Sequence, residues 1–177
     1  MNVEIRLSKG QDAHIIKNLW PLYQHDVSAF DASTPNRHGL FGVDDSVMTL
    51  AQHSELLDVW WREPRSLFPY LILVDGCPAG FNLVAARSRL PKTIQADFVV
   101  HEFFVLHAYR GKGVGEKAVV DGFVKHRGKW EIVTYPNHVR AIAFWRRVIN
   151  RYSRTEYSEN EMDHAWGRKV VFSFENA

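Results

Sequence analysis

The sequence predicts a mixed α/β (α+β) fold in which helices flank a central, mostly antiparallel sheet. Two hydrophobic periods alternate along the 177 residues, a period of two that is typical of strands and a helical spacing. The apolar fraction of 46% and the charged fraction of 24% are close to those of average folded proteins, which disfavours disorder. No internal repeat and no linker rich in Pro, Gly or Ser divides the chain, so we predict one domain over residues 1–177.

The first third of the chain predicts a strand, a helix and a long loop. The strand carries alternating apolar residues at Val3, Ile5 and Leu7. Apolar residues then recur at helical spacing over 15–22, where Pro21 is expected to kink or divide the helix. Residues 32–45 are rich in turn formers and predict an irregular loop, a kind of segment that is often functional.

The middle of the chain predicts a short helix followed by three strands. Leu56, Leu57, Trp60 and Trp61 form a helical stripe that ends before a proline. Apolar runs at 67–74 and 79–86 flank a four-residue turn, residues 75–78, and predict an antiparallel hairpin. A third strand is predicted over residues 97–106.

The last third predicts a helix over 113–126, a strand over 130–135, a helix over 140–149 and strands over 154–157 and 169–174. The resulting order β-α-α-β-β-β-α-β-α-β-β requires one or more parallel crossings in the sheet.

Composition excludes several classes of protein. A net charge of +2 gives little attraction to nucleic acid, and no apolar run approaches the roughly 18 residues of a membrane-spanning helix. The lone Cys77 cannot form an internal disulfide, and the N-terminal residues lack the pattern of a signal peptide, so we expect a cytoplasmic protein. Nine histidines are spread without a ligand-like cluster, which predicts no metal site. Composition leaves the oligomeric state open, a homodimer included.

A basic, glycine-rich segment, residues 105–116, joins a predicted strand to a predicted helix. Glycines allow an anion to approach the unpaired amides of a helix start, and Arg110 and Lys112 add positive charge, so we expect a phosphorylated cofactor here. A Walker A loop does not fit, because the positions five residues beyond Gly111 and Gly113 hold no glycine. A dinucleotide fingerprint fails as well, because Glu116 occupies the third glycine position.

The segment does match the pattern Arg-x-x-Gly-x-Gly, through Arg110, Gly113 and Gly115, and thereby resembles the acyl-CoA pyrophosphate loop of the GNAT superfamily of N-acetyltransferases. A second resemblance starts at Asn137 and continues through Ala141, Phe144 and Trp145. Two departures are visible: Asn137 precedes Ala141 by four positions instead of three, and Trp145 replaces the usual tyrosine. Tryptophan cannot act as the acid that protonates the leaving thiolate.

The resemblance implies an acetyl-CoA-dependent N-acetyltransferase whose cosubstrate lies between two splayed strands, those carrying residues 103–106 and 130–135. Backbone groups of Val105 and Leu106 would bind the pantetheine arm, and the Val105 amide would polarise the thioester. The pyrophosphate would be held by the backbone amides of Arg110, Gly111, Lys112, Gly113, Val114 and Gly115, with Asn137 near the cofactor. The acceptor would be a small-molecule amine or a peptide that attacks directly in a ternary complex. A non-catalytic acyl-CoA binding module is the alternative.

Glu102 is the candidate general base, because an alkylamine is mostly protonated at pH 7 and must lose a proton before it attacks. Strict alternation places Glu102 on one strand face with Phe98, Val100, Phe104 and Leu106. The alternative role is a structural ion pair. The family's acceptor side would be walled by residues Tyr23, His25, Asp26, Trp60 and Trp61, with core packing the favoured role of both tryptophans. Asn137 has a structural alternative as a helix cap.

Overall fold

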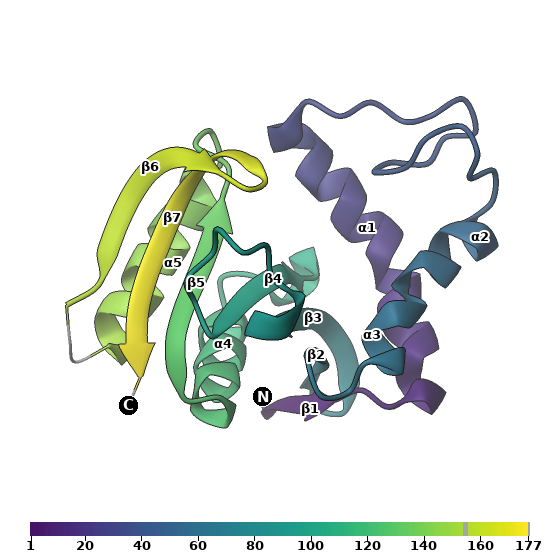
Figure 1. Ribbon diagram of the computed structural model, residues 1–177. Helices are drawn as coiled ribbons and strands as arrows, with labels where there is room; N and C mark the ends of the chain where they lie inside the picture. The colour runs from purple at the N-terminus through teal and green to yellow at the C-terminus, as the bar shows by residue number, and fades with distance from the viewer. Residues whose placement is uncertain (154–155, 177) are drawn as a thin grey trace.

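The computed structural model describes residues 1–153 and 156–176, and its centre is a seven-stranded sheet (Figure 1). The strands follow the spatial order β1-β2-β3-β4-β5-β7-β6. Their bounds are β1 Val3–Leu7, β2 Leu67–Val74, β3 Cys77–Ala86, β4 Phe98–Val105, β5 Gly128–Thr134, β6 Ser158–His164 and β7 Gly167–Asn176. All neighbouring strands pair antiparallel except β4 and β5, which are parallel. The predicted mostly antiparallel mixed sheet is confirmed.

Helices cover both faces of this sheet. Helix α1 (Ala13–Asp31), α2 (Leu50–Glu55) and α3 (Val59–Arg62) lie on one side (Figure 1), where Ile16, Leu19 and Trp60 pack on apolar residues of β2 and β3. Helix α4 (Val114–Lys125) and α5 (Val139–Tyr152) cover the other face, where Phe123 and Trp145 enter the largest apolar cluster. Short 3-10 turns complete the chain at Gly10–Asp12, Leu56–Asp58, Arg87–Arg89 and His107–Tyr109. We call the two faces the α1 face and the α4 face.

Two local predictions need correction. Pro21 was expected to kink or divide the first helix, and it does not divide it: α1 continues through Pro21, because a proline removes one backbone hydrogen bond and the buried Ile16 and Leu19 still anchor the helix to the sheet. The β2–β3 turn has two residues rather than four: Val74 pairs with Cys77, and Asp75 and Gly76 have φ angles of 49° and 82°. Positive φ at both positions gives the tight turn whose twist suits a hairpin.

The first of the two late strands was predicted in the wrong place. The predicted strand at 154–157 includes two residues, 154 and 155, that lie outside the described part of the chain, and residues 156 and 157 are not in a strand. The strand that pairs with β7 is β6, Ser158–His164, whose sequence SENEMDH is almost entirely polar and mostly exposed. An edge strand that buries little side-chain surface gives no alternating apolar signal.

The two parallel strands separate along their length. Pairing between β4 and β5 comprises three residue pairs and ends at Val100 and Ile132, although β4 continues to Val105 and β5 to Thr134. The predicted splay is confirmed. It leaves one side of the second half of β4 without a neighbouring strand.

A β-bulge at His101 changes which residues of β4 face α1. The register steps from the Val84/Val100 pair to the Leu83/Glu102 pair, so His101 has no opposite residue. As a result Phe98 and Val100 pack on the α4 face, and Phe104 and Leu106 pack on the α1 face. The single face expected from strict alternation was wrong, because one inserted residue moves every later side chain to the opposite face.

Candidate functional site

The glycine turn that follows β4 leads directly into α4. Gly111 and Gly113 have φ angles of 73° and 80°, and Gly113 is the residue from which α4 starts. These angles are strained for residues with a Cβ, although nothing within 4 Å would touch a Cβ at either position. At position 115 a glycine is favoured by lack of space, because a Cβ there would lie 3.3 Å from the ring of Phe144.

Most amides of this turn have no partner within the protein. The Arg110 amide donates to the His107 carbonyl at 3.2 Å, whereas in the described part of the chain the amides of residues 111–115 donate to no protein acceptor. Unpaired amides at a helix N-terminus attract anions, through both the hydrogen bonds and the helix dipole. The turn therefore has the chemistry of a phosphate-binding site.

The Arg110 side chain connects this turn to α1 instead of extending into solvent. Its guanidinium donates to Asp26 Oδ2 at 2.5 Å and to the Val105 carbonyl at 2.6 Å, and it lies 3.1 Å from His107 Nε2. Lys112 Nζ donates to the Ala108 carbonyl at 2.8 Å. Both cations thus lie beside the turn, with protein partners of their own.

The backbone of Val105 faces the gap between β4 and β5. The Leu106 amide donates to Ala79 of β3 at 2.8 Å, and successive residues of a strand direct their amides to opposite sides. The Val105 amide therefore points away from β3, on the side where pairing with β5 has already ended at Val100. It is a donor that a ligand in the gap can use, whereas the Leu106 amide is already bonded.

Glu102 lies on the α1 face of the same strand, beyond the bulge. Its Oε2 accepts a hydrogen bond from the Tyr23 hydroxyl, and its Oε1 lies 3.4 Å from His101 Nδ1. The Glu102 side chain retains 24% of its exposure, so the carboxylate is accessible to a ligand. Burial, followed by the negative charge of Glu102, raises the pKa of Tyr23 well above its usual value, so this phenol remains a hydrogen-bond donor.

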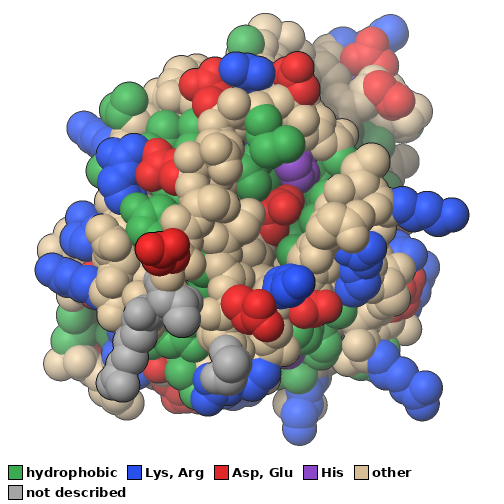
Figure 2. All heavy atoms as spheres, turned by 60° about the vertical axis from the view of Figure 1, so that its left-hand side comes forward, with side chains coloured by type: hydrophobic (Ala, Val, Ile, Leu, Met, Phe, Trp, Pro, Cys, Tyr) green, Lys and Arg blue, Asp and Glu red, His purple; other side chains and the backbone are tan. Residues whose placement is uncertain are grey.

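A cavity of about 230 Å³ opens beside Glu102. Residues of α1, of the loop after α1, of the stretch from α2 to α3, and of β4 surround this cavity. They include Trp20, Gln24, His53, Trp60, His101 and Glu102. On the face drawn in Figure 2, a histidine and an acidic side chain lie near the middle among hydrophobic side chains, while Lys and Arg lie mostly toward the edge.

The cavity includes two residues that the sequence analysis missed. Trp20 lies on α1 and stacks on Phe81 at 6.0 Å between ring centroids, and His53 lies on α2 and is 4% exposed. The helical period of α1 could have indicated Trp20, because it lies next to Leu19 on the buried side. His53 stands in a polar stretch with no apolar period, so no sequence signal pointed to it.

The other residues expected on the acceptor side divide into two groups. Trp60 lines the cavity beside Glu102 and the Tyr23 hydroxyl donates to Glu102, so both lie at the site. Trp61 points elsewhere, donating to Ser8 Oγ at 3.3 Å, and His25 packs edge-on against Phe41. Asp26 is engaged with Arg110, as described above.

Asn137 and Trp145 lie on the far side of the gap. The Asn137 side chain donates to the Phe30 carbonyl at 3.0 Å, and the N-cap residue of α5 is His138, so the expected alternative of an Asn137 cap is wrong. Trp145 is 5% exposed and packs against Phe103 and Phe144. A tyrosine does lie near the open end of β5: Tyr135, whose ring centroid is 3.5 Å from Lys169 Nζ.

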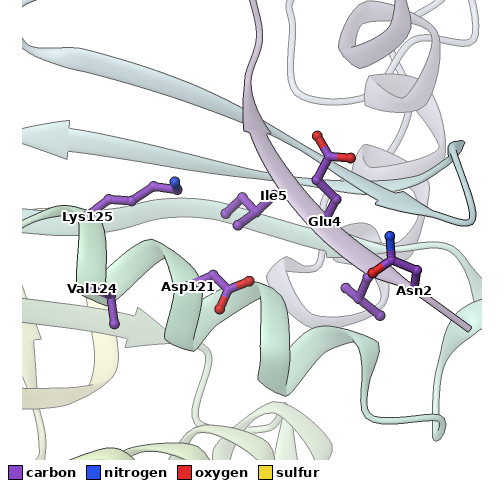
Figure 3. Close-up of a pocket in the computed structure, with 7 residues that line it drawn as sticks. Asn2, Glu4, Ile5, Asp121, Val124 and Lys125 are labelled. Atoms are coloured by element: carbon purple, nitrogen blue, oxygen red, sulfur yellow. The ribbon is translucent and has the colours of Figure 1, made fainter.

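A second cavity, about 340 Å³, lies between β1 and α4 (Figure 3). Its described lining includes Asn2, Glu4, Asp121 and Lys125 and shares no residue with the Glu102 cavity. Among the described residues, no cluster of three or more His, Cys, Asp or Glu side chains could hold a metal ion. Within the same ranges, 1–153 and 156–176, no helix is both long enough and apolar enough to cross a bilayer.

Comparisons with known proteins give a consistent result. The sequence matches the acetyltransferase (GNAT) family over residues 34–149. No curated protein matches it. An acetyltransferase from Thermus thermophilus has a similar structure, with a TM-score of 0.65, 12% identity, and coverage of 99% of this chain and 98% of the other.

Two further solved structures are similar to this chain. The aminoglycoside acetyltransferase AAC(6')-Ib, in complex with ribostamycin and coenzyme A, has a TM-score of 0.68 and 16% identity, covering 99% of this chain and 94% of the other. The ribosomal-protein-S5-alanine acetyltransferase from Vibrio fischeri has a TM-score of 0.61 and 15% identity, with the same coverage of 99% and 94%.

Proposed function

Because the chain belongs to the GNAT family of acetyltransferases, we propose that it is an N-acetyltransferase that transfers an acetyl group from acetyl-CoA to a primary amine by direct attack in a ternary complex. One observation carries the proposal. Strand β4 presents Glu102 on the α1 face and then, past the end of its pairing with β5, the Val105 amide and the glycine turn. A proton acceptor, an oxyanion donor and an anion site thus follow one another along one strand.

The residues present fit acetyl-CoA. The unpaired amides of residues 111–115 suit a pyrophosphate, and the unpaired side of β4 near Val105 suits an extended amide chain that pairs like a strand. When bound, acetyl-CoA supplies an activated acyl group. The proposed site consists of the residues Glu102, Val105, Leu106, Arg110, Gly111, Lys112, Gly113, Val114, Gly115 and Asn137. The amides of Arg110 and Leu106 already donate to carbonyl groups within the protein.

In this proposal Glu102 removes the proton of the acceptor's ammonium group. An alkylamine has a pKa near 10, so at pH 7 the attacking form is scarce without a base. The hydrogen bond from Tyr23 fixes the carboxylate and leaves Oε1 toward His101 and the cavity. The Val105 amide would stabilise the negative charge that develops on the carbonyl oxygen.

The thiolate that leaves needs little help from an acid. A thiol has a pKa near 8.5, so water or the acceptor's own proton suffices, and the buried Trp145 has no acidic proton to give. The Trp145 substitution is also the observation that favours the alternative, a non-catalytic acyl-CoA binding module.

The proposal is tested by melting experiments and by thiol release. Acetyl-CoA at about a hundredfold its Kd should stabilise the fold by about 2.7 kcal/mol, or roughly 5–10 °C for a chain of this size, and ATP and NAD should do much less. Amine-dependent release of CoA should accompany this shift. An equal shift with NAD, or none with acetyl-CoA, contradicts the proposal; a shift without release for any class of amine identifies the binding module.

Four statements stay predictions. They are the single domain over residues 1–177, the cytoplasmic location, an acceptor that is neither nucleic acid nor membrane, and a reaction without a metal.

A further inference from the structure

Strand β1 forms one edge of the sheet, and one row of its backbone groups has no partner in the described part of the chain. The spatial order of the strands ends at β1, which pairs with β2 alone. Asn2 and Ser8, which flank β1, form backbone hydrogen bonds toward the β2 side at 2.9 and 2.8 Å. Because the backbone groups of successive strand residues alternate in direction, those of Val3, Ile5 and Leu7 point away from β2. They form a row of donors and acceptors that can pair with a further strand.

The side chains at this edge leave apolar surface exposed. Val3 and Ile5 pack on apolar residues of α4. Leu7, which alternation places on the same face, is 44% exposed, and Val124 of α4 is 54% exposed. The cavity of about 340 Å³ between β1 and α4 lies along this edge, with Val3, Ile5 and Val124 in its lining (Figure 3). An apolar side chain from a neighbouring strand would therefore meet both a cavity and apolar contacts here.

The sequence of β1 is complementary to a second copy of itself. Antiparallel pairing of two β1 strands about Ile5 places Glu4 of each copy opposite Arg6 of the other, so the pair of opposite charges occurs twice. The same register places Leu7 opposite Val3. It also brings the outward backbone groups of Val3, Ile5 and Leu7 together, because these residues share one parity along the strand. Both charged side chains are exposed and therefore available for this pairing.

The opposite edge of the sheet does not suit self-pairing. Strand β6 carries Glu159, Glu161 and Asp163. Antiparallel pairing of two copies about the middle residue, Glu161, would place Glu161 opposite Glu161 and Glu159 opposite Asp163. Like charges directly opposite each other destabilise a sheet. Pairing of β6 with β1 of another copy would be heterologous and would continue into an open chain of molecules, whereas self-pairing of β1 closes at two copies.

We propose that two copies of this chain pair through β1, about a two-fold axis at Ile5, and join their two seven-stranded sheets into one continuous sheet. Leu7 of each copy then lies beside Val3 of the other, at the cavity between β1 and α4, and the charged pairs form on the opposite face. Strands β2 and β3 separate this interface from β4, which carries Glu102. The inference therefore goes beyond the proposed function and does not depend on it.

Charge reversal tests the register of the two strands. Sedimentation of the wild type should show a particle with twice the mass of one chain. Glu4→Lys places two cations opposite each other and Arg6→Glu places two carboxylates opposite each other, so each change should raise the dimer Kd by about tenfold or more. The double variant Glu4→Lys/Arg6→Glu restores opposite charges and should return the Kd to within about threefold of wild type.

The ion pair between Arg6 and Asp12, 3.2 Å long, is lost in both variants that carry Arg6→Glu. Recovery of the dimer in the double variant therefore reports the contact between the copies and not this internal pair. Glu161→Lys is the matched control, because it reverses an exposed carboxylate on the other edge of the sheet and should leave the dimer Kd unchanged.

Hydrogen exchange followed by NMR tests the backbone pairing directly. The amides of Val3, Ile5 and Leu7 should exchange more slowly as the protein concentration rises, and this slowing should disappear in Glu4→Lys. The amides of Glu4 and Arg6 point toward β2 and give the internal control, since their protection should not depend on the dimer.

Three results would overturn the proposal. The first is a wild-type protein that remains monomeric at about 100 μM, since a Kd far above that concentration corresponds to no stable dimer. The second is a dimer whose Kd neither Glu4→Lys nor Arg6→Glu changes, which places the interface elsewhere. The third is a dimer that Glu161→Lys dissociates, which assigns the interface to β6.

Discussion

The Glu102 carboxylate is a residue whose role a single atom change can test. Glu102→Gln keeps the shape and the contact with Tyr23 but removes the proton acceptor, so the rate should fall by about 10²- to 10⁴-fold with the affinity for acetyl-CoA almost unchanged. Steady-state kinetics and calorimetric titration of acetyl-CoA measure the two quantities. Raising the pH should recover much of the lost rate, because free amine then forms without the base.

A loss of stability in the Glu102→Gln variant without a loss of turnover would contradict the role of Glu102 as a base. If Glu102→Gln melts at a much lower temperature and the folded fraction turns over at the wild-type rate, Glu102 is a structural residue and the base must be sought among His101, His107, His138 or water. Tyr23→Phe is the matched variant. It removes the donor to Glu102 and leaves the carboxylate in place, so its effect on rate should be much smaller than that of Glu102→Gln.

Trp145 stands where the family usually has a tyrosine, and its burial limits what a substitution can restore. Trp145→Tyr should change turnover by less than about tenfold, because the thiol leaves readily, and should lower the melting temperature, because the smaller side chain leaves space beside Phe103 and Phe144. Turnover at saturating substrates and a thermal melt measure both effects. A gain of several hundredfold would instead show that the protein has been selected for binding rather than catalysis.

At single residues, the sequence indicated candidates for the site but not their contacts. Glu102 and Val105 are candidates because they belong to a strand that ends in a recognisable glycine turn. The hydrogen bond from Tyr23 to Glu102 could not be predicted, because Tyr23 comes from a segment about 80 residues earlier and meets Glu102 only through tertiary packing. Similarly, no local pattern shows that the Arg110 guanidinium is taken by Asp26.

The glycine turn between β4 and α4 can be tested as an element. Gly113→Val places a β-branched residue at a φ of 80°, which should cost about 1–2 kcal/mol, or roughly 2–8 °C in melting temperature, and should abolish the stabilisation by acetyl-CoA. Gly167→Val is the matched control. Gly167 has a φ of 85° and open space, but it is the first residue of β7, next to the β6–β7 turn, so this variant should lose similar stability and keep the acetyl-CoA shift. If both variants keep the rise in melting temperature caused by acetyl-CoA, the turn does not bind the cofactor.

The elements themselves were largely predictable, because most of them bury one face. Helices α4 and α5 and the strands β1 to β5 and β7 follow apolar periods, and the structure contains them within a few residues of the predicted bounds. Helix α1 continues to Asp31, nine residues beyond the predicted stretch, and α2 was not predicted. Strand β6 was not predicted at its true position because it is polar along its length. The bulge at His101 was not predicted because an inserted residue looks like any other polar position in a strand. That bulge also explains why the predicted neighbours of Glu102 were partly wrong.

The stability of the whole molecule should fall at alkaline pH. Burial raises the pKa of Tyr70 to about 12, and burial also raises the pKa of Tyr23 and of Tyr135. The unfolded chain loses these protons near pH 10. The stability contributed by the neutral phenols is therefore complete below about pH 10 and is lost as the pH rises through the higher pKa values of the folded state. Melting temperatures across pH 8 to 12 check this, and Tyr70→Phe should weaken the dependence.

The stability of the protein should also fall at acidic pH. Burial lowers the pKa of His53, His126 and His138, so the folded state holds these rings neutral at a pH where the unfolded chain binds protons. Their contribution is present above about pH 6.5 and is lost as the pH falls through the lower folded pKa values. A melting temperature that stays level from pH 6.5 down to pH 5 would contradict it. His126→Phe, which also ends the 2.7 Å contact with Tyr70, should flatten part of the acid limb.

The early end of the pairing between β4 and β5 affects how ligands come and go. Because β4 and β5 pair over three residue pairs and then separate, the Val105 amide has no bond to a neighbouring strand. A ligand that reaches the Val105 amide breaks no backbone hydrogen bond of the sheet on arrival, and it restores none to the sheet on leaving. In the proposed function, exchange of acetyl-CoA breaks no pairing between strands, so we expect its rate to follow diffusion and ligand affinity rather than a slow opening of the fold.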